Sequence, residues 1–543
     1  MPMIELPQPT FSSAVVCVIV GIFTLKLVSV FLKRKGASAS KSSRDDLDAL
    51  SRCLVLFEDD KEEAVLFVHA AEIFQEKVAF AGFAEQFIRI YCGKGRFAQR
   101  LVQDDGDRPY WTQAADDWKP MDNISCIDED ITHEGLEKML GDMCSTPLPT
   151  DKPLWRVVFL QNYKPRDSDV ITSAFVWKYH HTIADGFTAM RHVVSHCTPV
   201  DETKTIEELF STSRDVSARR EKVRIKRSHS CSECNFGLFS SGGLLLRQVS
   251  LSSIGTLISK FSNAVLKLVF LPKDPPNPCK PNYHLEKRSR RVCSFAGLGE
   301  EFSVKEIKKL ARQASVGQSK KTTVNDILIT AVFRTLAKYC EENPGKGGQT
   351  PEKLTAGMWV ALNSGSPFEF APTESKWGNE KLGVCYLNAP VKTIPAEEQL
   401  GAVHRGIREL IGSPEPYVAN RVLSFFGALP HCIAKPWWDM TADKVTISLS
   451  NVPGPQAALR WPVNRHEDLK EQIPRTGLIR DLLFFVPPVL DVGIMLCIIS
   501  YNDRVNVGMA TAGDWINQAD ADRMIKDFFP QAMREIKQTM SSP

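Results

Sequence analysis

The chain has 543 residues, of which 43% are hydrophobic and 24% are charged, with 32 glycines and 33 prolines. This ordinary globular composition excludes collagen-like, low-complexity and mostly disordered proteins. The net charge of +3 gives no global field of the kind that marks a nucleic-acid-binding protein, so no nucleic-acid partner is expected. The 14 cysteines are scattered along the whole chain, which indicates reduced thiols rather than the disulfide framework of a small secreted domain.

The first predicted element is an apolar stretch from Phe11 to Leu32, which as a helix would span roughly 33 Å, enough for a bilayer core of about 30 Å. Positive charge follows it at residues 33–35, and Lys26 lies near its end, from where it can snorkel towards the headgroups. We therefore expect an uncleaved single-pass anchor, with the body of the protein in the cytosol. The expected membrane is that of the endoplasmic reticulum, with the plasma membrane or a lipid droplet as alternatives. The sequon at Asn123 would then stay unglycosylated.

Beyond this anchor the chain divides into segments of different character. Residues 33–53 are expected to form a polar linker, and residues 54–200 mix apolar runs with helical patterns as an α/β unit does. Residues 201–291 hold a basic run, an amphipathic helical pattern and a proline cluster, and are interpreted as a crossover. The basic run fits either an anionic lipid surface or a solvated connector. Residues 292–543 alternate again, with a helix predicted from Val324 to Cys340, so the sequence predicts an α/β protein of two lobes.

The usual cofactor and metal motifs are missing from the sequence. It contains no GxGxxG dinucleotide loop, no GxxxxGK[ST] phosphate loop and no GxSxG elbow. Cys231 and Cys234 form a CxxC pair without a second pair or a histidine at zinc spacing. We therefore expect neither a resident cofactor nor a metal site.

The segment with the clearest chemistry runs from Val170 to Gly186. A β-rich run ends in His180 and His181, an Asp185-Gly turn follows, and a helical pattern begins directly afterwards. Because neighbouring side chains of a strand point to opposite faces, one histidine should face a cavity while the other packs. An imidazole titrates near neutral pH and can act as a general base. A hydrogen-bonded structural pair of histidines is the alternative.

The sequence HHTIADG resembles the HHxxxDG motif of acyl-CoA-dependent acyltransferases and condensation enzymes. Further segments resemble the PLW, ND and SNVPGP motifs of the wax ester synthase/diacylglycerol acyltransferase family, and the resemblance runs from about Leu54 to Ile536. These segments are Pro153-Leu154-Trp155, Asn325-Asp326 and Ser450-Asn451-Val452-Pro453-Gly454-Pro455. The resemblance implies two chloramphenicol-acetyltransferase-like lobes, each a mixed sheet flanked by helices, around a central tunnel.

The resemblance also implies a reaction. A fatty acyl group would pass from a long-chain acyl-CoA, which is a co-substrate, to a fatty alcohol or diacylglycerol taken from the lipid bilayer. His181 would be the base that deprotonates the acceptor hydroxyl and then protonates the CoA thiolate, and His180 would support it. Asp185 would pair with an arginine and hold the loop, and Gly186 would make room for the backbone. Asn451 is the candidate oxyanion donor or tunnel-shaping residue.

Several of these motif residues also have a structural interpretation. The pair Asn325-Asp326 can cap a helix together with Thr322 or Thr323, and this is favoured over direct catalysis. Pro453-Gly454 is turn chemistry, so the segment around it can be a rigid turn or part of the site. Trp155 is expected to pack in the core beside the active strand.

The chain departs from the family pattern at two positions. Pro149 stands where the family commonly has an aspartate before PLW, and Asn363 stands where an arginine is usual, after a strand predicted from Gly357 to Leu362. Without that arginine, Asp185 needs another partner.

Two rival functions remain, namely acyl transfer to another alcohol or an amine, and an inactive membrane-tethered lipid-binding scaffold of the same fold.

Overall fold

The computed structural model describes residues 45–55, 66–92, 95–103, 109–201, 203, 264, 266–268, 270–280, 290–315, 321–344, 351–362, 382–411, 413–429, 434–437, 441, 443–462, 476–488 and 492–541. The predicted anchor at 11–32, the basic run, Cys231, Cys234 and Asn363 lie outside these residues, as does most of the predicted crossover. Within the described ranges, no helix combines the length and the apolar character needed to cross a bilayer.

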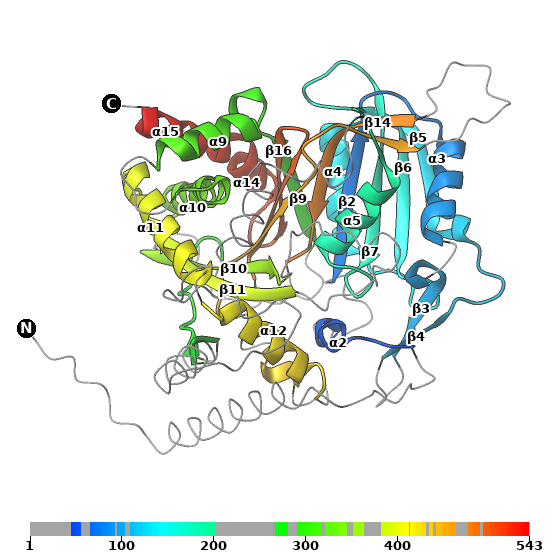
Figure 1. Ribbon diagram of the computed structural model, residues 1–543, viewed down its shortest axis with the longest axis horizontal. Coiled ribbons are helices and arrows are strands. Elements are labelled where there is room, and N and C mark those ends of the chain that lie inside the picture. Colours follow the sequence, from blue (N-terminus) through cyan, green and yellow to red (C-terminus); the bar gives the residue numbers. More distant parts are fainter. Residues whose placement is uncertain are drawn as a thin grey trace, which may run out of the picture.

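Two sheets form the two lobes, which stand next to each other in Figure 1. In the described residues the first lobe has a seven-stranded sheet of order β5-β6-β7-β2-β14-β13-β8, and the second has a six-stranded sheet of order β11-β10-β12-β15-β16-β9. The first sheet consists of β2 (Phe67–Phe74), β5 (Ile124–Thr132), β6 (Trp155–Lys164), β7 (Thr172–His180), β8 (Thr198–Pro199), β13 (Leu459–Pro462) and β14 (Thr476–Phe485). The second consists of β9 (Arg291–Gly297), β10 (Lys353–Ala361), β11 (Leu382–Pro390), β12 (Ile447–Pro453), β15 (Ile494–Tyr501) and β16 (Arg504–Ala512). A small third sheet joins β1 (Asp45–Asp46), β4 (Tyr110–Gln113) and β3 (Gln99–Val102).

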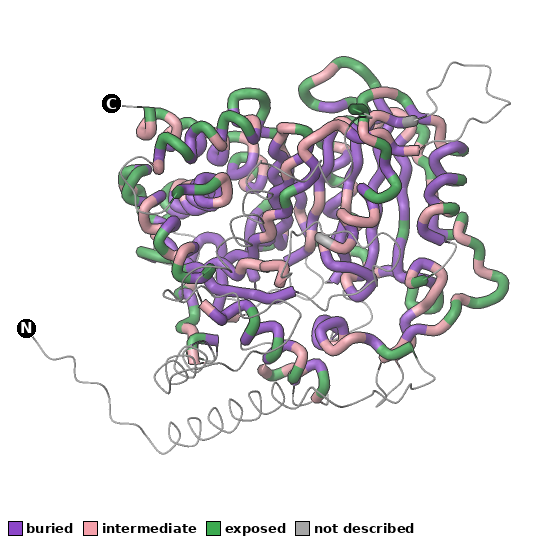
Figure 2. The backbone as a smooth tube through the Cα atoms, viewed as in Figure 1, coloured by how far each residue is buried: buried purple, intermediate pink, exposed green. Residues whose placement is uncertain are grey.

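Helices cover both faces of each large sheet. The first sheet packs against α4 on one face and against α3 and α5 on the other, and the second packs against α9, α10, α11 and α15 on one face and α12 on the other. The helices are α2 (Ala49–Val55), α3 (Phe80–Phe87), α4 (His133–Ser145), α5 (Gly186–His196), α9 (Val304–Gln313), α10 (Val324–Glu342), α11 (Ala396–Ile411), α12 (Glu415–Phe426), α14 (Gln518–Asp522) and α15 (Phe529–Ser541). Figure 2 shows the buried residues concentrated in the strands and on the inner sides of the helices. The α/β fold with two lobes is the architecture expected from the sequence.

The sequence assigned all of residues 292–543 to the second lobe, and this assignment is wrong for two strands. β13 and β14 lie in the C-terminal segment, yet both belong to the sheet of the first lobe. β14 runs antiparallel to β2, with Phe484 opposite Ala70 and Phe485 opposite His69. Strand pairing over such a separation depends on long-range packing that periodicity along the chain does not reveal. In the described residues, the C-terminal segment therefore contributes strands to both large sheets.

The predicted linker at 33–53 is too long, because its last residues belong to α2. Asp48 begins this helix by accepting the backbone N–H of Ser51 at 2.7 Å. Leu50 and Cys53 are buried with residues of α12 and β11. The end of the predicted linker is thus the start of a helix that packs on the second lobe.

The core of the first lobe is strongly aromatic, and one carboxyl group is buried in it. The ring of Tyr91 lies 4.8 Å from that of Trp177 and 6.3 Å from that of Trp461. Glu72 of β2 is 2% exposed, and its Oε2 has no hydrogen-bond partner among the described residues. Burial raises the pKa of Glu72 from 4.5 to about 8, because the low-dielectric core disfavours the carboxylate.

Candidate active site

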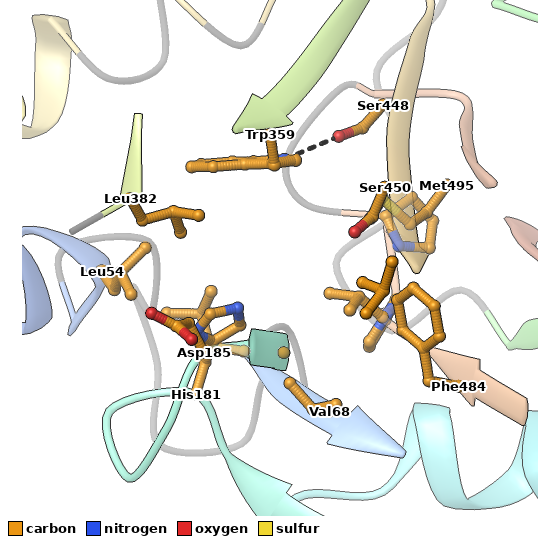
Figure 3. A pocket seen from close by; sticks show the side chains of 16 residues that line it. Leu54, Val68, His181, Asp185, Trp359, Leu382, Ser448, Ser450, Phe484 and Met495 are labelled. Atoms are coloured by element: carbon orange, nitrogen blue, oxygen red, sulfur yellow. Dashed lines mark hydrogen bonds between the residues drawn. The ribbon is translucent and has the colours of Figure 1, made fainter. Parts of the chain in front are cut away.

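A pocket between the two lobes contains the histidine motif (Figure 3). It holds about 820 Å³ of empty space, including its open mouth. Its walls come from α2, β2, α5 and β14 on one side and from β10, β11, β12 and β15 on the other. The apolar lining includes Leu54, Leu66, Val68, Trp359, Leu382 and Met495, and the polar lining consists of His181, Asp185, Ser448 and Ser450.

His181 reaches this pocket from the turn that follows β7. Its backbone N–H donates to the carbonyl of Leu66 at 2.7 Å, and the N–H of His180 donates to the carbonyl of Leu154 at 2.9 Å. The first bond ties the turn to the chain entering β2, and the second ties it to the start of β6. The side chain of His181 lines the pocket, whereas His180 is 1% exposed and does not. This is the division of roles that strand geometry predicts.

His180 is fixed within the turn by its own neighbours. Its Nδ1 lies 2.6 Å from the Thr182 hydroxyl oxygen and accepts the Thr182 backbone N–H at 3.2 Å. Because a backbone N–H can only donate, Nδ1 is the acceptor nitrogen, and a neutral ring then carries its proton on Nε2. The ring also meets Phe67 edge to face at 5.1 Å. These contacts hold the peptide that presents His181.

Asp185 caps the helix that follows the histidines. Its Oδ1 accepts the backbone N–H of Thr188 at 2.7 Å, which makes it the N-cap of α5. Burial raises the pKa of Asp185, while the Thr188 hydrogen bonds and the nearby positive charges of His181 and Arg191 act to lower it. The family resemblance implied an arginine ion pair, but the contact seen here is a helix cap, with Arg191 acting through its charge. The capping role follows from an Asp directly before a helical pattern.

Gly186 also lines the pocket. The family resemblance implied that glycine makes room for the backbone at this position, and the structure does not require it. A Cβ at this position would meet Val452 Cγ2 at 3.7 Å, an ordinary contact distance. No close approach of backbone therefore requires glycine here. Its effect is to leave space open in the pocket next to His181.

The opposite wall of the pocket is β12. Ser448, Ser450 and Val452 alternate along this strand and line the pocket, and the indole N–H of Trp359 donates to the Ser448 hydroxyl at 3.0 Å. Asn451 points to the other face, where its amide N–H donates to Asn325 Oδ1 at 2.8 Å. The hypothesis that Asn451 is the oxyanion donor is therefore not supported, and the polar group of this motif that lines the pocket is Ser450.

Asp326 belongs to the structural frame behind this wall. Thr323 is the N-cap of α10, and its backbone N–H donates to Asp326 Oδ2 at 2.6 Å in a capping box. The same oxygen lies 3.2 Å from His404 Nδ1 and 3.7 Å from Arg408. Asp326 thus has the capping role that the sequence favoured. Asn325 couples this helix start to β12 through its bond to Asn451.

The PLW segment braces the active strand from the other side. Trp155 is buried and donates its indole N–H to the Phe97 carbonyl at 2.9 Å, and Leu154 is buried beside it. Asn123, which has no role in the predicted site, donates its amide to the carbonyls of Pro153 at 3.0 Å and Trp155 at 2.5 Å. The amide nitrogen of the sequon is therefore buried and engaged, so this fold offers no glycosylation site there.

The SNVPGP segment combines both roles that the sequence left open. Its first residues belong to β12 and form the pocket wall, while Pro453 ends the strand. At Gly454 a Cβ would lie 2.2 Å from the Ser500 carbonyl oxygen, so only glycine allows β15 to pass this close. The segment is thus pocket wall in its first half and a tight structural contact in its second.

No group of three or more His, Cys, Asp or Glu side chains that could hold a metal ion occurs in the ranges that the structure describes. The chemistry available in the pocket is that of an imidazole, a carboxyl group and two hydroxyls in mainly apolar surroundings.

Solved structures with the same fold cover nearly the whole chain. The wax ester synthase/diacylglycerol acyltransferase from Marinobacter aquaeolei VT8 aligns with a TM-score of 0.56 and 17% identity, over 92% of this chain and 100% of that one. The TRI3 trichothecene 15-O-acetyltransferase from Fusarium sporotrichioides aligns with a TM-score of 0.55 and 11% identity, over 93% and 97%. The first condensation domain of the calcium-dependent antibiotic synthetase aligns with a TM-score of 0.53 and 11% identity, over 93% and 98%. At these identities the likeness establishes the fold, which is the two-lobed fold shared by acyltransferases and condensation domains.

Sequence comparison shows which of the proteins with this fold the chain resembles. The family model described as the WS/DGAT C-terminal domain matches residues 377–537. Wax ester synthase/diacylglycerol acyltransferase 5 of Arabidopsis thaliana is 28% identical over 211 residues, 39% of this chain and 37% of that protein. Wax ester synthase/diacylglycerol acyltransferase 4 of the same plant is 30% identical over 122 residues, 22% of each chain. The aligned part thus spans little more than a third of the first relative. Over part of its length the chain is thus similar to the wax ester synthase/diacylglycerol acyltransferase family.

Proposed function

We propose that this protein is an acyl-CoA-dependent O-acyltransferase that esterifies a long-chain fatty alcohol or diacylglycerol, giving wax ester or triacylglycerol. The observation that carries the proposal is the position of His181, the second histidine of the HHxxxDG motif, on the wall of a mainly apolar pocket between the lobes. A base at such a place can serve an acceptor hydroxyl while apolar side chains hold the chains of both substrates.

In the proposed mechanism His181 takes the proton of the acceptor hydroxyl as its oxygen attacks the thioester carbonyl. The tetrahedral intermediate collapses, the carbon–sulfur bond breaks, and the CoA thiolate takes the proton back from His181. No covalent acyl-enzyme is needed. General-base catalysis of this kind typically contributes about 10²- to 10⁴-fold in rate.

The remaining site residues hold this base in position or stabilise the transition state. His180 and Asp185 hold the turn and the helix start that carry His181. Ser450 faces the same pocket, and we assign its hydroxyl to the developing oxyanion. Asn325 and Asn451 hold β12 in place from behind and do not contact substrate.

The substrate class follows from the lining and from the family. The apolar side chains of Leu54, Leu66, Leu382 and Trp359 in the lining favour an unbranched hydrocarbon chain over a polar acceptor. Relatives of this family are named for both wax ester and diacylglycerol acyl transfer, and both acceptors are lipids. A membrane-anchored enzyme facing the cytosol, with residues 11–32 in the endoplasmic reticulum membrane, would meet the acceptor in the bilayer and acyl-CoA in the cytosol.

The test is an esterification assay on microsomes that contain the full chain. Labelled palmitoyl-CoA is supplied with a mixture of hexadecanol and diacylglycerol, and labelled wax ester and triacylglycerol are separated. The matched control for His181→Ala is His196→Ala, at the exposed end of α5 and outside the pocket. We expect product from wild type and His196→Ala and at least a hundredfold less from His181→Ala. Equal product from the two histidine variants would refute the assignment of the base. No product from any of them would favour another acceptor or an inactive scaffold.

A further inference from the structure

Trp359 has the largest side chain in the lining of the candidate active site. It belongs to β10 in the second lobe, whereas His181 enters the pocket from the first lobe. Figure 3 shows the two side chains on opposite sides of the pocket, with the indole seen edge-on, so one face of the ring is turned towards the interior. Core tryptophans such as Trp155 and Trp177 are fully buried, whereas Trp359 is half-buried. Part of its ring is therefore available to a substrate.

A hydrogen bond fixes the indole in this position. Its N–H donates to the Ser448 hydroxyl of β12 at 3.0 Å. Gly357 is the register partner of Ser448, and Trp359 lies two residues further along β10, so the indole crosses from its own strand to the next. Breaking such a bond to turn the ring away costs roughly 0.5 to 1.5 kcal/mol. The ring is therefore a fixed part of the pocket wall.

The ring of Trp359 separates the pocket from an apolar cluster. It packs against the buried cluster that contains Leu54, Leu66 and Leu382, which line the same pocket. Val384, the register partner of Trp359 on β11, belongs to this cluster as well. A small side chain in place of the indole would therefore widen the pocket towards apolar side chains. The added width would suit a hydrocarbon chain, because apolar surface gains free energy when it leaves water.

The size of the pocket limits how many hydrocarbon chains it can hold. The pocket that the described residues form has about 820 Å³ of empty space, including its open mouth. Pockets for one drug-sized molecule hold roughly 300 to 1,000 Å³. A fatty alcohol brings one long chain to the site and diacylglycerol brings two, in addition to the acyl chain of the thioester. A pocket in this range suits two chains better than three, and the largest side chain of its lining, Trp359, takes up the most space.

We propose that Trp359 determines which acceptor the site takes. By narrowing the pocket opposite His181, the indole admits an alcohol with one hydrocarbon chain and disfavours diacylglycerol, which has two. This inference deepens the proposed function and rests on it for the reaction, since the same base would serve either acceptor hydroxyl. One methylene too many or too few in a hydrophobic pocket changes the specificity by about 10- to 200-fold, so a second long chain should be disfavoured by about tenfold or more.

The first test is a competition between acceptors on microsomes that contain the full chain. Labelled palmitoyl-CoA is supplied with equal amounts of hexadecanol and diacylglycerol, and the ratio of wax ester to triacylglycerol is measured. Wild type should favour wax ester by about tenfold or more, and Trp359→Ala should lower the ratio by about tenfold or more. Trp359→Phe, which keeps a ring, should lower it less. The matched control is Met358→Ala, since Met358 packs against the core on the other face of the same strand and should leave the ratio unchanged.

A binding measurement separates this inference from the proposed reaction. The purified full chain in detergent is titrated with a hexadecanol that carries bromine atoms on its chain, because bromine quenches the fluorescence of a tryptophan that it contacts. Wild type and His181→Ala should both be quenched, and Trp359→Phe should lose most of the quenching. A diacylglycerol brominated on both chains should quench wild type severalfold less at the same concentration.

The two experiments together decide the proposal. Equal wax ester and triacylglycerol from wild type would overturn it, and so would a ratio in Trp359→Ala that matches the ratio in Met358→Ala. If no variant transfers an acyl group, the proposed function fails and the binding result decides the role of Trp359. Quenching that Trp359→Phe removes would support that role, and quenching that it leaves unchanged would overturn it. The melting of each variant is compared with wild type, and Trp359→Leu replaces the alanine variant if that variant does not fold.

Discussion

Replacing Glu72 by Gln should change how the stability of the protein depends on pH. This carboxyl group is buried in the aromatic core of the first lobe, and burial raises its pKa from 4.5 to about 8. The folded chain therefore keeps a proton that the unfolded chain releases. The stability that protonated Glu72 provides is complete below about pH 4.5 and is lost as the pH rises through about 8.

The size of the effect follows from these two values. Each pH unit over which only the folded chain holds the proton costs about 1.36 kcal/mol of unfolding free energy. Between pH 5 and pH 9 the wild type should therefore lose about 4 kcal/mol that the Glu72→Gln variant keeps. The variant leaves an unpartnered amide in the place of an unpartnered carboxyl oxygen, so any further offset between the two proteins should be the same at every pH.

The assay is guanidinium unfolding at pH 5, 7 and 9, followed by tryptophan fluorescence. Trp177 and Trp461 belong to the same core cluster and report on it. Glu85→Gln, on the exposed side of α3, is the control and should follow the wild type at every pH. A difference between wild type and Glu72→Gln that stays constant within about 1 kcal/mol from pH 5 to pH 9 would refute the reasoning.

Three substitutions test the construction of the site. Gly186→Ala should leave the thermal midpoint within a few degrees of wild type, because the added Cβ fits against Val452. It should lower the esterification rate at least tenfold, because this Cβ occupies the pocket beside the base. An unchanged rate would contradict this prediction. Gly454→Ala should lower the yield of folded protein sharply in an expression and melting assay, since the added Cβ would lie 2.2 Å from the Ser500 carbonyl oxygen. Normal melting would contradict this, because it would show that β15 can move away. Asn451→Ala should cost about 1 kcal/mol in unfolding free energy and lower kcat with little change in KM, because it releases β12 from Asn325; a selective rise in KM would indicate direct substrate contact instead.

Local patterns were sufficient to find the active strand and the orientation of its histidines. A β-rich run that ends in His180 and His181, followed by a turn and a helical pattern, places one ring outward and one inward by the geometry of a strand alone. The structure has β7 ending at His180, with His181 lining the pocket. The same rule, applied to Ser450 and Asn451, would have shown that only one of these neighbours can face the pocket.

Other features depend on contacts that no local pattern encodes. β14 joins the first sheet through its pairing with β2, although its sequence fits either lobe equally well. Trp359 and Asn123 acquire their roles from partners distant in the chain, Ser448 and Pro153 respectively. Their residue types are compatible with many surroundings, so sequence alone gives no reason to single them out.

The central claim is that His181 is the base of an acyl-CoA-dependent O-acyltransferase. The most direct measurement compares microsomes that contain wild type, His181→Ala or His196→Ala, supplied with labelled palmitoyl-CoA and a lipid acceptor. Labelled wax ester or triacylglycerol from wild type and His196→Ala, with at least a hundredfold less from His181→Ala at equal protein level, is the predicted result. Undiminished product from His181→Ala would contradict the account.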